Sequence, residues 1–148
     1  MKRKVLENNL EYKITVINAD ASDLPFPDSS FDCVTIAFGI RNFQDRGAAL
    51  REILRVLDKG GQLVILELSM PSNKILRWFY SLGFKTVAPL VGGRFSGNRE
   101  AYRYLPESVS TFPGKDEWTA FMRDCGYAAV THRAFSLGIC RMYTGTKE

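Results

Sequence analysis

The stretch ADASDLPFPDSSFDCVTIAFGIRN, residues 19–42, begins just after one expected strand and contains the carboxyl end of a second. The first strand, residues 12–18, is β-branched and apolar, and Asp20 follows it. The second includes residues 35–38, an apolar run without polar alternation, which is typical of a parallel-sheet strand covered on both faces. Open parallel sheets bind ligands at the carboxyl ends of their strands. The sequence therefore predicts a site between Asp20 and residues 39–42.

A helix and a third strand are expected after Asn42. Asp45 is a candidate amino-terminal cap of the helix, and Gly60 is expected just past its carboxyl end. Residues 63–68 form another unbroken apolar run, which again needs cover on both faces. The sequence therefore predicts a strand, helix and strand unit with a right-handed crossover.

The middle of the chain, residues 71–95, is aromatic and aliphatic with isolated cations. It fits either a helix packed on the sheet or an amphipathic lid that touches lipid or an isoprenoid tail. Residues 102–110 are expected to form a short helix that Pro106 kinks or interrupts, because proline lacks the N–H that an interior turn needs.

The last part of the chain predicts a helix and a strand pair. Residues 115–124 are expected to form an amphipathic helix with Gly126 past its end. Its inward side chains are Trp118, Phe121 and Met122. Residues 127–135 and 137–144 alternate and are joined closely, so they should pair antiparallel. A chain of 148 residues is too short for two comfortable domains, so we expect one α/β domain that finishes in an antiparallel pair.

Charge and hydropathy narrow the class of protein. The formal net charge is +4, and the basic residues are scattered apart from residues 2–4, which argues against a nucleic-acid partner. A mild attraction to anionic membrane surfaces, and hence peripheral membrane contact, remains open. The chain shows neither a signal peptide nor an uncharged apolar run of about 18 residues, so no membrane span is predicted.

The cysteines and the single histidine give no metal signal. Cys33, Cys125 and Cys140 are odd in number and never approach a C-x-x-C spacing. This pattern predicts reduced core residues of a cytoplasmic protein rather than a disulfide or a metal set. His132 lies in an alternating run without a nearby carboxylate in sequence, which favours a surface or pairing role over catalysis.

Short motifs extend from residue 20 to residue 108. They are Asp20-Ala21, Leu24-Pro25-Phe26-Pro27-Asp28, Phe31-Asp32, Phe38-Gly39-Ile40-Arg41-Asn42, Arg55-Val56-Leu57, Gly60-Gly61, Glu67 and Ser69, Tyr102-Arg103-Tyr104-Leu105, and Ser108. Together they resemble the S-adenosylmethionine-dependent C-methyltransferases of ubiquinone and menaquinone biosynthesis. The resemblance implies a Rossmann-like class I methyltransferase sheet that is truncated at its amino end. Residues 1–148 would be one domain that lacks the first strand, the glycine turn and the second strand.

The resemblance also implies how S-adenosylmethionine would bind. Asp20 would accept a hydrogen bond from the adenine amino group, with the backbone of Ala21 beside it. Ala37 and Phe38 would present backbone and ring to the methionine part. The alternative for Asp20 is a loop or cap aspartate without a role in cofactor binding. Because the missing glycine turn and the missing acid normally hold the carboxypropyl and ribose regions, cofactor affinity is expected to be poor.

The same resemblance places Arg41, Asn42, Tyr102 and Tyr104 at the acceptor. An arginine near a phenol favours the phenolate and can polarise a water that takes the proton. The alternatives are a solvated arginine beside a helix-capping asparagine, and tyrosines that only pack. The family usually has Lys or Arg followed by Pro where this chain has Asp58 and Lys59, a change that should alter little in a turn.

The implied function is C-methylation of a prenylated quinol, a demethylmenaquinol or ubiquinol precursor, in the complete protein, with this chain alone inactive. A methyltransferase for another small acceptor remains an alternative, as does a non-catalytic fragment that acts as an interaction module. The missing strands would leave residues 34–38 with a free edge. Either residues 13–17 close onto it, two copies pair there as a homodimer, or a complementing chain covers it.

Overall fold

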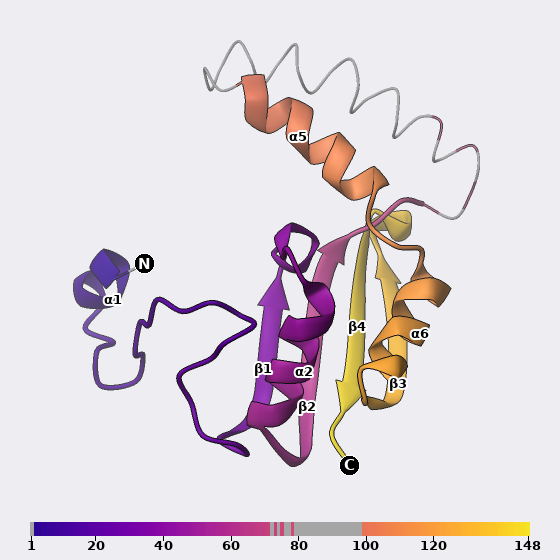
Figure 1. Ribbon diagram of the computed structural model, residues 1–148. Helices are drawn as coiled ribbons and strands as arrows, with labels where there is room; N and C mark the ends of the chain where they lie inside the picture. Colours follow the sequence, from indigo (N-terminus) through magenta and orange to yellow (C-terminus); the bar gives the residue numbers. More distant parts are fainter. Residues whose placement is uncertain (1, 72, 74, 76–77, 79–98) are drawn as a thin grey trace.

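A four-stranded sheet with the order β1-β2-β4-β3 runs through the computed structural model (Figure 1). The structure describes residues 2–71, 73, 75, 78 and 99–148, with the side chains of 99–103 and 106 outside the description. The elements in chain order are α1 (Lys2–Glu7), β1 (Phe31–Ala37), η1 (Ile40–Asn42), α2 (Arg46–Val56), β2 (Leu57–Leu68), α5 (Arg99–Ser110), α6 (Lys115–Asp124), β3 (Ala128–Phe135), η3 (Ser136–Gly138) and β4 (Cys140–Thr146).

Strand pairing follows the predicted pattern. β1 and β2 are parallel, with Thr35 opposite Val64, and α2 connects them. β4 pairs antiparallel with β2 on one side and with β3 on the other. The strand, helix and strand unit and the closing antiparallel pair are therefore confirmed. Because β1 and β2 run in the same direction, their carboxyl ends lie at one edge of the sheet.

The ends of α2 confirm one prediction and correct another. The Asp45 carboxylate accepts a hydrogen bond from the Ala48 N–H at 2.8 Å, so Asp45 is the predicted cap. The helix ends at Val56, however, and Gly60 lies inside β2, where its φ of +81° suits glycine. A Cβ at Gly61 would lie 2.8 Å from the carbonyl oxygen of Asp58. The glycine pair therefore shapes the beginning of the strand rather than the end of the helix.

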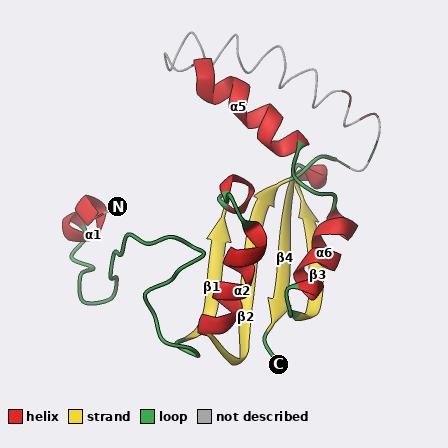
Figure 2. Cartoon of the chain, viewed as in Figure 1, coloured by secondary structure: helices red, strands yellow, loops and turns green. Residues whose placement is uncertain are grey.

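The core lies on one face of the sheet. Figures 1 and 2 show α2 and α6 on the same side of the strands. The buried side chains of this face include Leu50, Ile53, Leu63, Ile65, Trp118, Met122 and Tyr143. On the other face Val64 and Leu66 are half-buried, and Thr35 is exposed. The prediction of cover on both faces is therefore wrong within the described residues, because both helices pack on one side.

Residues 12–18 do not form the predicted strand. They run as an irregular segment between α1 and the sheet, and Tyr12 is 77% exposed. A β-branched run becomes a strand only where it finds a hydrogen-bonding partner, and the only partner of β1 among the described residues is β2. The suggested closure of residues 13–17 onto β1 is thus absent from the structure.

The remaining predictions for the helices and cysteines have mixed outcomes. Helix α5 continues through Pro106 without interruption. Helix α6 buries Trp118 and Met122 fully, and Gly126 follows it with a φ of +102°, as predicted. The three cysteines are free, but Cys33 is exposed and Cys140 only half-buried, so only Cys125 is a core residue.

The stretch 71–95, predicted as a helix or lid, lies mostly outside the described residues. None of the described helices has the length and apolar character needed to cross a membrane.

Candidate functional site

The candidate site lies where β1 and β2 end. The short helix η1 follows β1 directly, and α5 passes over this edge of the sheet (Figure 1). A cavity of about 540 Å³ opens between the segment that precedes β1 and the beginning of α2. Its lining residues are Ala19, Asp20, Ala21, Ser22, Asn42, Phe43, Gln44, Asp45 and Ala49. The structure thus brings Asp20 and Ala21 together with Asn42, as the sequence predicted, in a volume typical of small-molecule sites.

Asp20 is held in a local turn. Its Oδ1 accepts hydrogen bonds from the Ser22 N–H at 2.8 Å and the Ser22 hydroxyl at 2.7 Å. The Ser22 side chain and then its backbone lower the pKa of the Asp20 carboxyl, which keeps it ionised. Its Oδ2 accepts no hydrogen bond from the described residues. One carboxylate oxygen is therefore used to fix the turn, and the other is left to accept a donor in the cavity.

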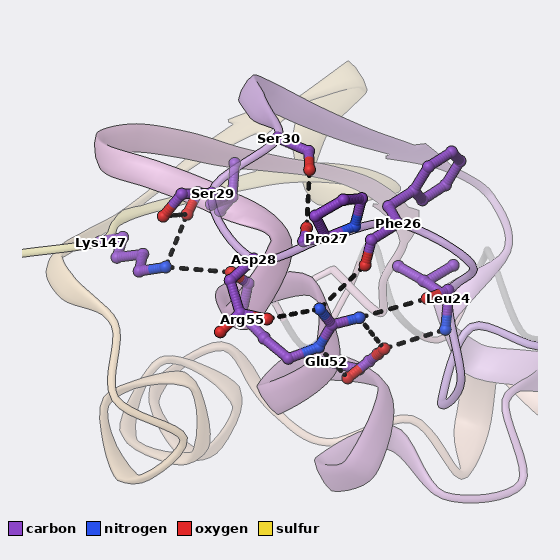
Figure 3. Close-up of polar contacts among 10 residues, drawn as sticks. Leu24, Phe26, Pro27, Asp28, Ser29, Ser30, Glu52, Arg55 and Lys147 are labelled. Carbon is purple, nitrogen blue, oxygen red and sulfur yellow. Dashed lines mark hydrogen bonds and ion pairs between the residues drawn. The ribbon is translucent and has the colours of Figure 1, made fainter.

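The proline loop between the cavity and β1 is fastened to α2 by Arg55 and Glu52 (Figure 3). The Arg55 guanidinium donates to the carbonyls of Leu24 and Phe26 at 3.2 and 2.9 Å and to Asp28 at 2.7 Å. Glu52 pairs with Arg55 at 2.6 Å and accepts the Leu24 N–H at 2.9 Å.

Arg55 first, and then the Leu24 N–H, lower the pKa of Glu52 to about 2. The Glu52 carboxylate is therefore ionised at neutral pH and keeps its charge for the pair with Arg55. The Arg55-Val56-Leu57 motif thus has a structural reason, since Arg55 determines the path of the loop that carries Asp20 toward β1.

Arg41 is paired with a buried carboxylate that the sequence did not assign to the site. Its Nη1 lies 2.6 Å from Glu67 Oε1 and donates to the Phe38 carbonyl at 2.8 Å. Its backbone N–H donates to Glu67 Oε2 at 3.2 Å. Glu67, at the end of β2, is fully buried, whereas the Arg41 side chain is 10% exposed. Arg41 is thus not the solvated arginine of the alternative interpretation, and Glu67 holds it at the edge of the sheet.

Tyr104 connects α5 to the same edge. Its hydroxyl donates to Asn42 Oδ1 at 2.7 Å, although the ring is 52% exposed. Asn42 is therefore not the helix cap of the alternative interpretation, because Asp45 caps α2. Tyr102 lies in α5, and its side chain falls outside the description.

The two residues predicted to face the methionine part lie apart from the cavity lining. Ala37 is the last residue of β1 and is exposed. Phe38 is 43% exposed with a φ of +54°, and its N–H donates to the Leu66 carbonyl at 2.8 Å. The roles predicted for Ala37 and Phe38 therefore stay predictions.

Curated relatives match almost the whole of this chain. It is 47% identical over 135 residues to "Ubiquinone/menaquinone biosynthesis C-methyltransferase UbiE" of Geobacter sulfurreducens. The aligned region covers 91% of this chain and 52% of the relative. Identity to the protein of the same name in Geotalea daltonii is 44%, over 99% of this chain and 62% of the relative. A "Demethylmenaquinone methyltransferase" of Porphyromonas gingivalis is 42% identical, over 99% of this chain and 60% of the relative. The chain thus spans about half to three fifths of the length of these relatives.

Solved structures share the fold at low identity. An S-adenosylmethionine-dependent methyltransferase from Aquifex aeolicus superposes with a TM-score of 0.65 at 18% identity, over 99% of this chain and 61% of that chain. A structure described as "PigF with SAH" superposes with a TM-score of 0.66 at 18% identity, over 99% of this chain and 44% of that chain. The four-stranded α/β sheet is thus the Rossmann-like sheet of class I methyltransferases. The sequence profile of the "ubiE/COQ5 methyltransferase family" matches residues 1–147, and the chain belongs to that family.

Proposed function

We propose that the complete protein transfers a methyl group from S-adenosylmethionine to a ring carbon of a prenylated benzoquinol or naphthoquinol. The observation that carries the proposal is that Asp20, Ala21 and Asn42 share one cavity at the edge where Glu67 holds Arg41. The relatives named as C-methyltransferases of ubiquinone and menaquinone biosynthesis support the choice of acceptor.

The residues of the cavity fit the adenine end of the cofactor. The free Oδ2 of Asp20 would accept the adenine amino group, and the backbone of Ala21 would lie beside the ring. The cofactor supplies a methyl group that its sulfonium has already activated. The protein therefore has chiefly to align donor and acceptor and to exclude water.

On the acceptor side, Asn42 and Tyr104 would orient the quinol, since they already meet at 2.7 Å. Tyr102 is proposed to help them. The acceptor hydroxyl must lose its proton as the carbon–carbon bond forms, and the Arg41 cation would favour the phenolate and polarise a water that takes the proton. Arg41 Nη2 and Nε donate to no described residue, and Nη2 is proposed for this contact because Nε is buried.

Calorimetric titration and a methyl-transfer assay test the proposal on two proteins. The first is this chain alone. The second, called the chimera below, joins the segment of the Geotalea daltonii enzyme that precedes the matched region to the amino end of this chain. We expect the chimera to bind S-adenosylmethionine and methylate a demethylmenaquinol or ubiquinol-precursor analogue. We expect this chain alone to do neither, because it spans only part of the length of its relatives.

The two possible failures are distinguishable. A folded chimera that binds the cofactor but methylates neither quinol would favour another small acceptor and refute the quinol assignment. Micromolar cofactor binding and turnover by this chain alone would refute its predicted inactivity and leave the quinol assignment intact.

A second candidate function is that of an interaction module. β1 pairs only with β2 among the described residues, so its outer edge is open to a further strand. Thr35 and Ala37 of this strand are exposed. We propose that two copies of this chain pair at this edge. We also propose that the protein works in the cytoplasm and contacts the surface of a membrane that holds the prenyl tail of the quinol.

Light scattering across a concentration range measures this pairing. We expect the mass of a dimer at high concentration and of a monomer on dilution. A lysine at Thr35 keeps the strand but places a charge on its exposed face, and it should shift the dissociation to higher concentration. A folded monomer at every concentration would contradict the dimer and leave a complementing chain as the partner.

A further inference from the structure

A second cavity, of about 290 Å³, lies near the ends of β2 and α5 and the beginning of α6. It shares no lining residue with the cavity at Asp20. Its apolar lining includes Met70, Val109 and Phe112, and its polar lining includes Ser69, Lys115 and Arg141. The Ser69 hydroxyl is already engaged, since it donates to the Gly138 carbonyl at 2.7 Å. The charged groups of the lining, the cations Lys115 and Arg141 and the carboxylates Asp116 and Glu117, therefore decide what this cavity can hold.

Arg141 is a buried cation that forms no ion pair with a described residue. The residue is 5% exposed, and no carboxylate of the described residues lies within 4 Å of its guanidinium. The one hydrogen bond from the guanidinium to a described residue joins Nη1 to His132 Nδ1 at 3.0 Å. Its neighbour across the strands, Glu67, is engaged by Arg41. Burying an unpaired charge is costly, so an anion in the cavity would relieve an unfavourable feature of the fold.

The partner of Arg141 cannot replace that anion. Burial first, and then the Arg141 and Lys115 charges, lower the pKa of His132, which keeps its imidazole neutral at neutral pH. The neutral ring accepts one hydrogen bond at Nδ1 and carries no charge. The guanidinium lines the cavity and has further N–H groups to donate there.

The beginning of α6 adds donors on another wall. Its cap residue, Gly114, offers no side chain, and the first N–H groups of a helix have no intrahelical acceptor. Gly114, Lys115, Asp116 and Glu117 all line the cavity. The Asp116 carboxylate is 82% exposed and pairs with Lys115 at 2.6 Å, and Glu117 is also exposed. The Lys115 hydrogen bond first, and the Arg141 charge after it, contribute to a lowered pKa of Asp116, but the attraction of Arg141 reaches an exposed carboxylate and does not act through a contact. Anions are favoured at a helix amino terminus in addition to the attraction of Arg141.

We propose that this cavity binds a small amphipathic oxyanion, an aromatic carboxylate or phenolate, with its charged oxygen at Arg141 and its ring against Met70, Val109 and Phe112. The volume is at the lower end of the range for ligand sites, which suits one ring with a short substituent. The site goes beyond the proposed methyl transfer and needs neither the cofactor nor the quinol.

Titration of this chain with sodium benzoate tests the site, with benzyl alcohol as the neutral analogue and inorganic phosphate as the anion without a ring. Isothermal calorimetry gives the dissociation constants, and amide NMR shifts at Gly114–Glu117 locate the binding. The deciding variant is Arg141→Met. Its matched control is Arg133→Met, which removes the same charge from an exposed position on β3.

We expect benzoate to bind, with shifts at residues 114–117, and to bind more weakly by on the order of tenfold or more in Arg141→Met. The Arg133→Met variant should bind benzoate as tightly as the parent chain does. Benzyl alcohol should bind to none of the three proteins. If Arg141→Met does not fold, Arg141→Gln carries the same test. Equal benzoate affinity with and without Arg141, or no binding at all, would overturn the site. Phosphate binding as tight as benzoate would overturn the ring-sized ligand class. None of these results bears on methyl transfer by the chimera.

Discussion

Replacing Glu67 with alanine is expected to lower the free energy of unfolding by about 3–5 kcal/mol, among the largest effects of any single change in this chain. The Arg41 guanidinium, 10% exposed, would lose its counter-charge, and the N–H groups of Arg41 and Leu68 would lose their acceptor. Urea denaturation followed by circular dichroism measures the change, and an unchanged m-value confirms that two-state unfolding is retained.

Two further variants separate the buried pair from ordinary surface charges. Asp28 also lies 2.7 Å from an arginine, Arg55, but its side chain is 77% exposed, so Asp28→Ala should cost at most about 1 kcal/mol. The double variant Arg41→Met with Glu67→Leu removes both charges and should recover most of the stability lost in the Glu67→Ala variant. A Glu67→Ala protein as stable as the Asp28→Ala protein would show that Glu67 does not anchor Arg41.

Features that depend on nearby residues were predictable from the sequence. Asp45 caps α2 and Gly126 ends α6 because each acts on backbone groups within a few positions of itself. The strand, helix and strand unit and the final antiparallel pair followed from apolar runs and short connections, whereas the pairing of β2 with β4 was not predicted. Asp20 and Asn42 share a cavity as predicted, but the parallel strand that was expected to end before Asp20 does not form.

Features that depend on pairing between distant segments were not predictable. Residues 12–18 have the composition of a strand, but composition cannot show whether a neighbouring strand is present to accept their hydrogen bonds. Gly60 resembles a helix terminator, yet the parallel pairing of Phe31 with Leu57 begins the strand before it.

The Arg41–Glu67 pair joins residues 26 positions apart and depends on the register that places Ala37 opposite Leu66. One signal for it was present in the sequence. Glu67 is the only charged residue in the apolar run 63–68, and a carboxylate in a buried strand usually has a cationic partner. Arg141, directly opposite Glu67 in β4, carries the same signal. Both residues could therefore have been singled out by charge within a strand, although their partners could not.

Arg41→Ala in the chimera should reduce the turnover number by about 10²–10⁴, the usual range for lost general acid–base assistance. The dissociation constant of S-adenosylmethionine should change far less, because the Arg41 guanidinium lies on Glu67 and Phe38 rather than in the lining of the Asp20 cavity. Rapid quench with radiolabelled cofactor measures turnover, and calorimetry measures binding.

The Arg41→Ala variant also leaves Glu67 as a buried, unpaired carboxylate, which could lower turnover through instability alone. Adding Glu67→Gln removes that charge, so the double variant should regain stability but not turnover. Arg41→Lys keeps a cation beside Glu67 but lacks the planar fork, and it should retain part of the turnover. If the double variant turns over at the parent rate, Arg41 serves only to neutralise Glu67, and the acceptor proton leaves by a route that does not involve this arginine.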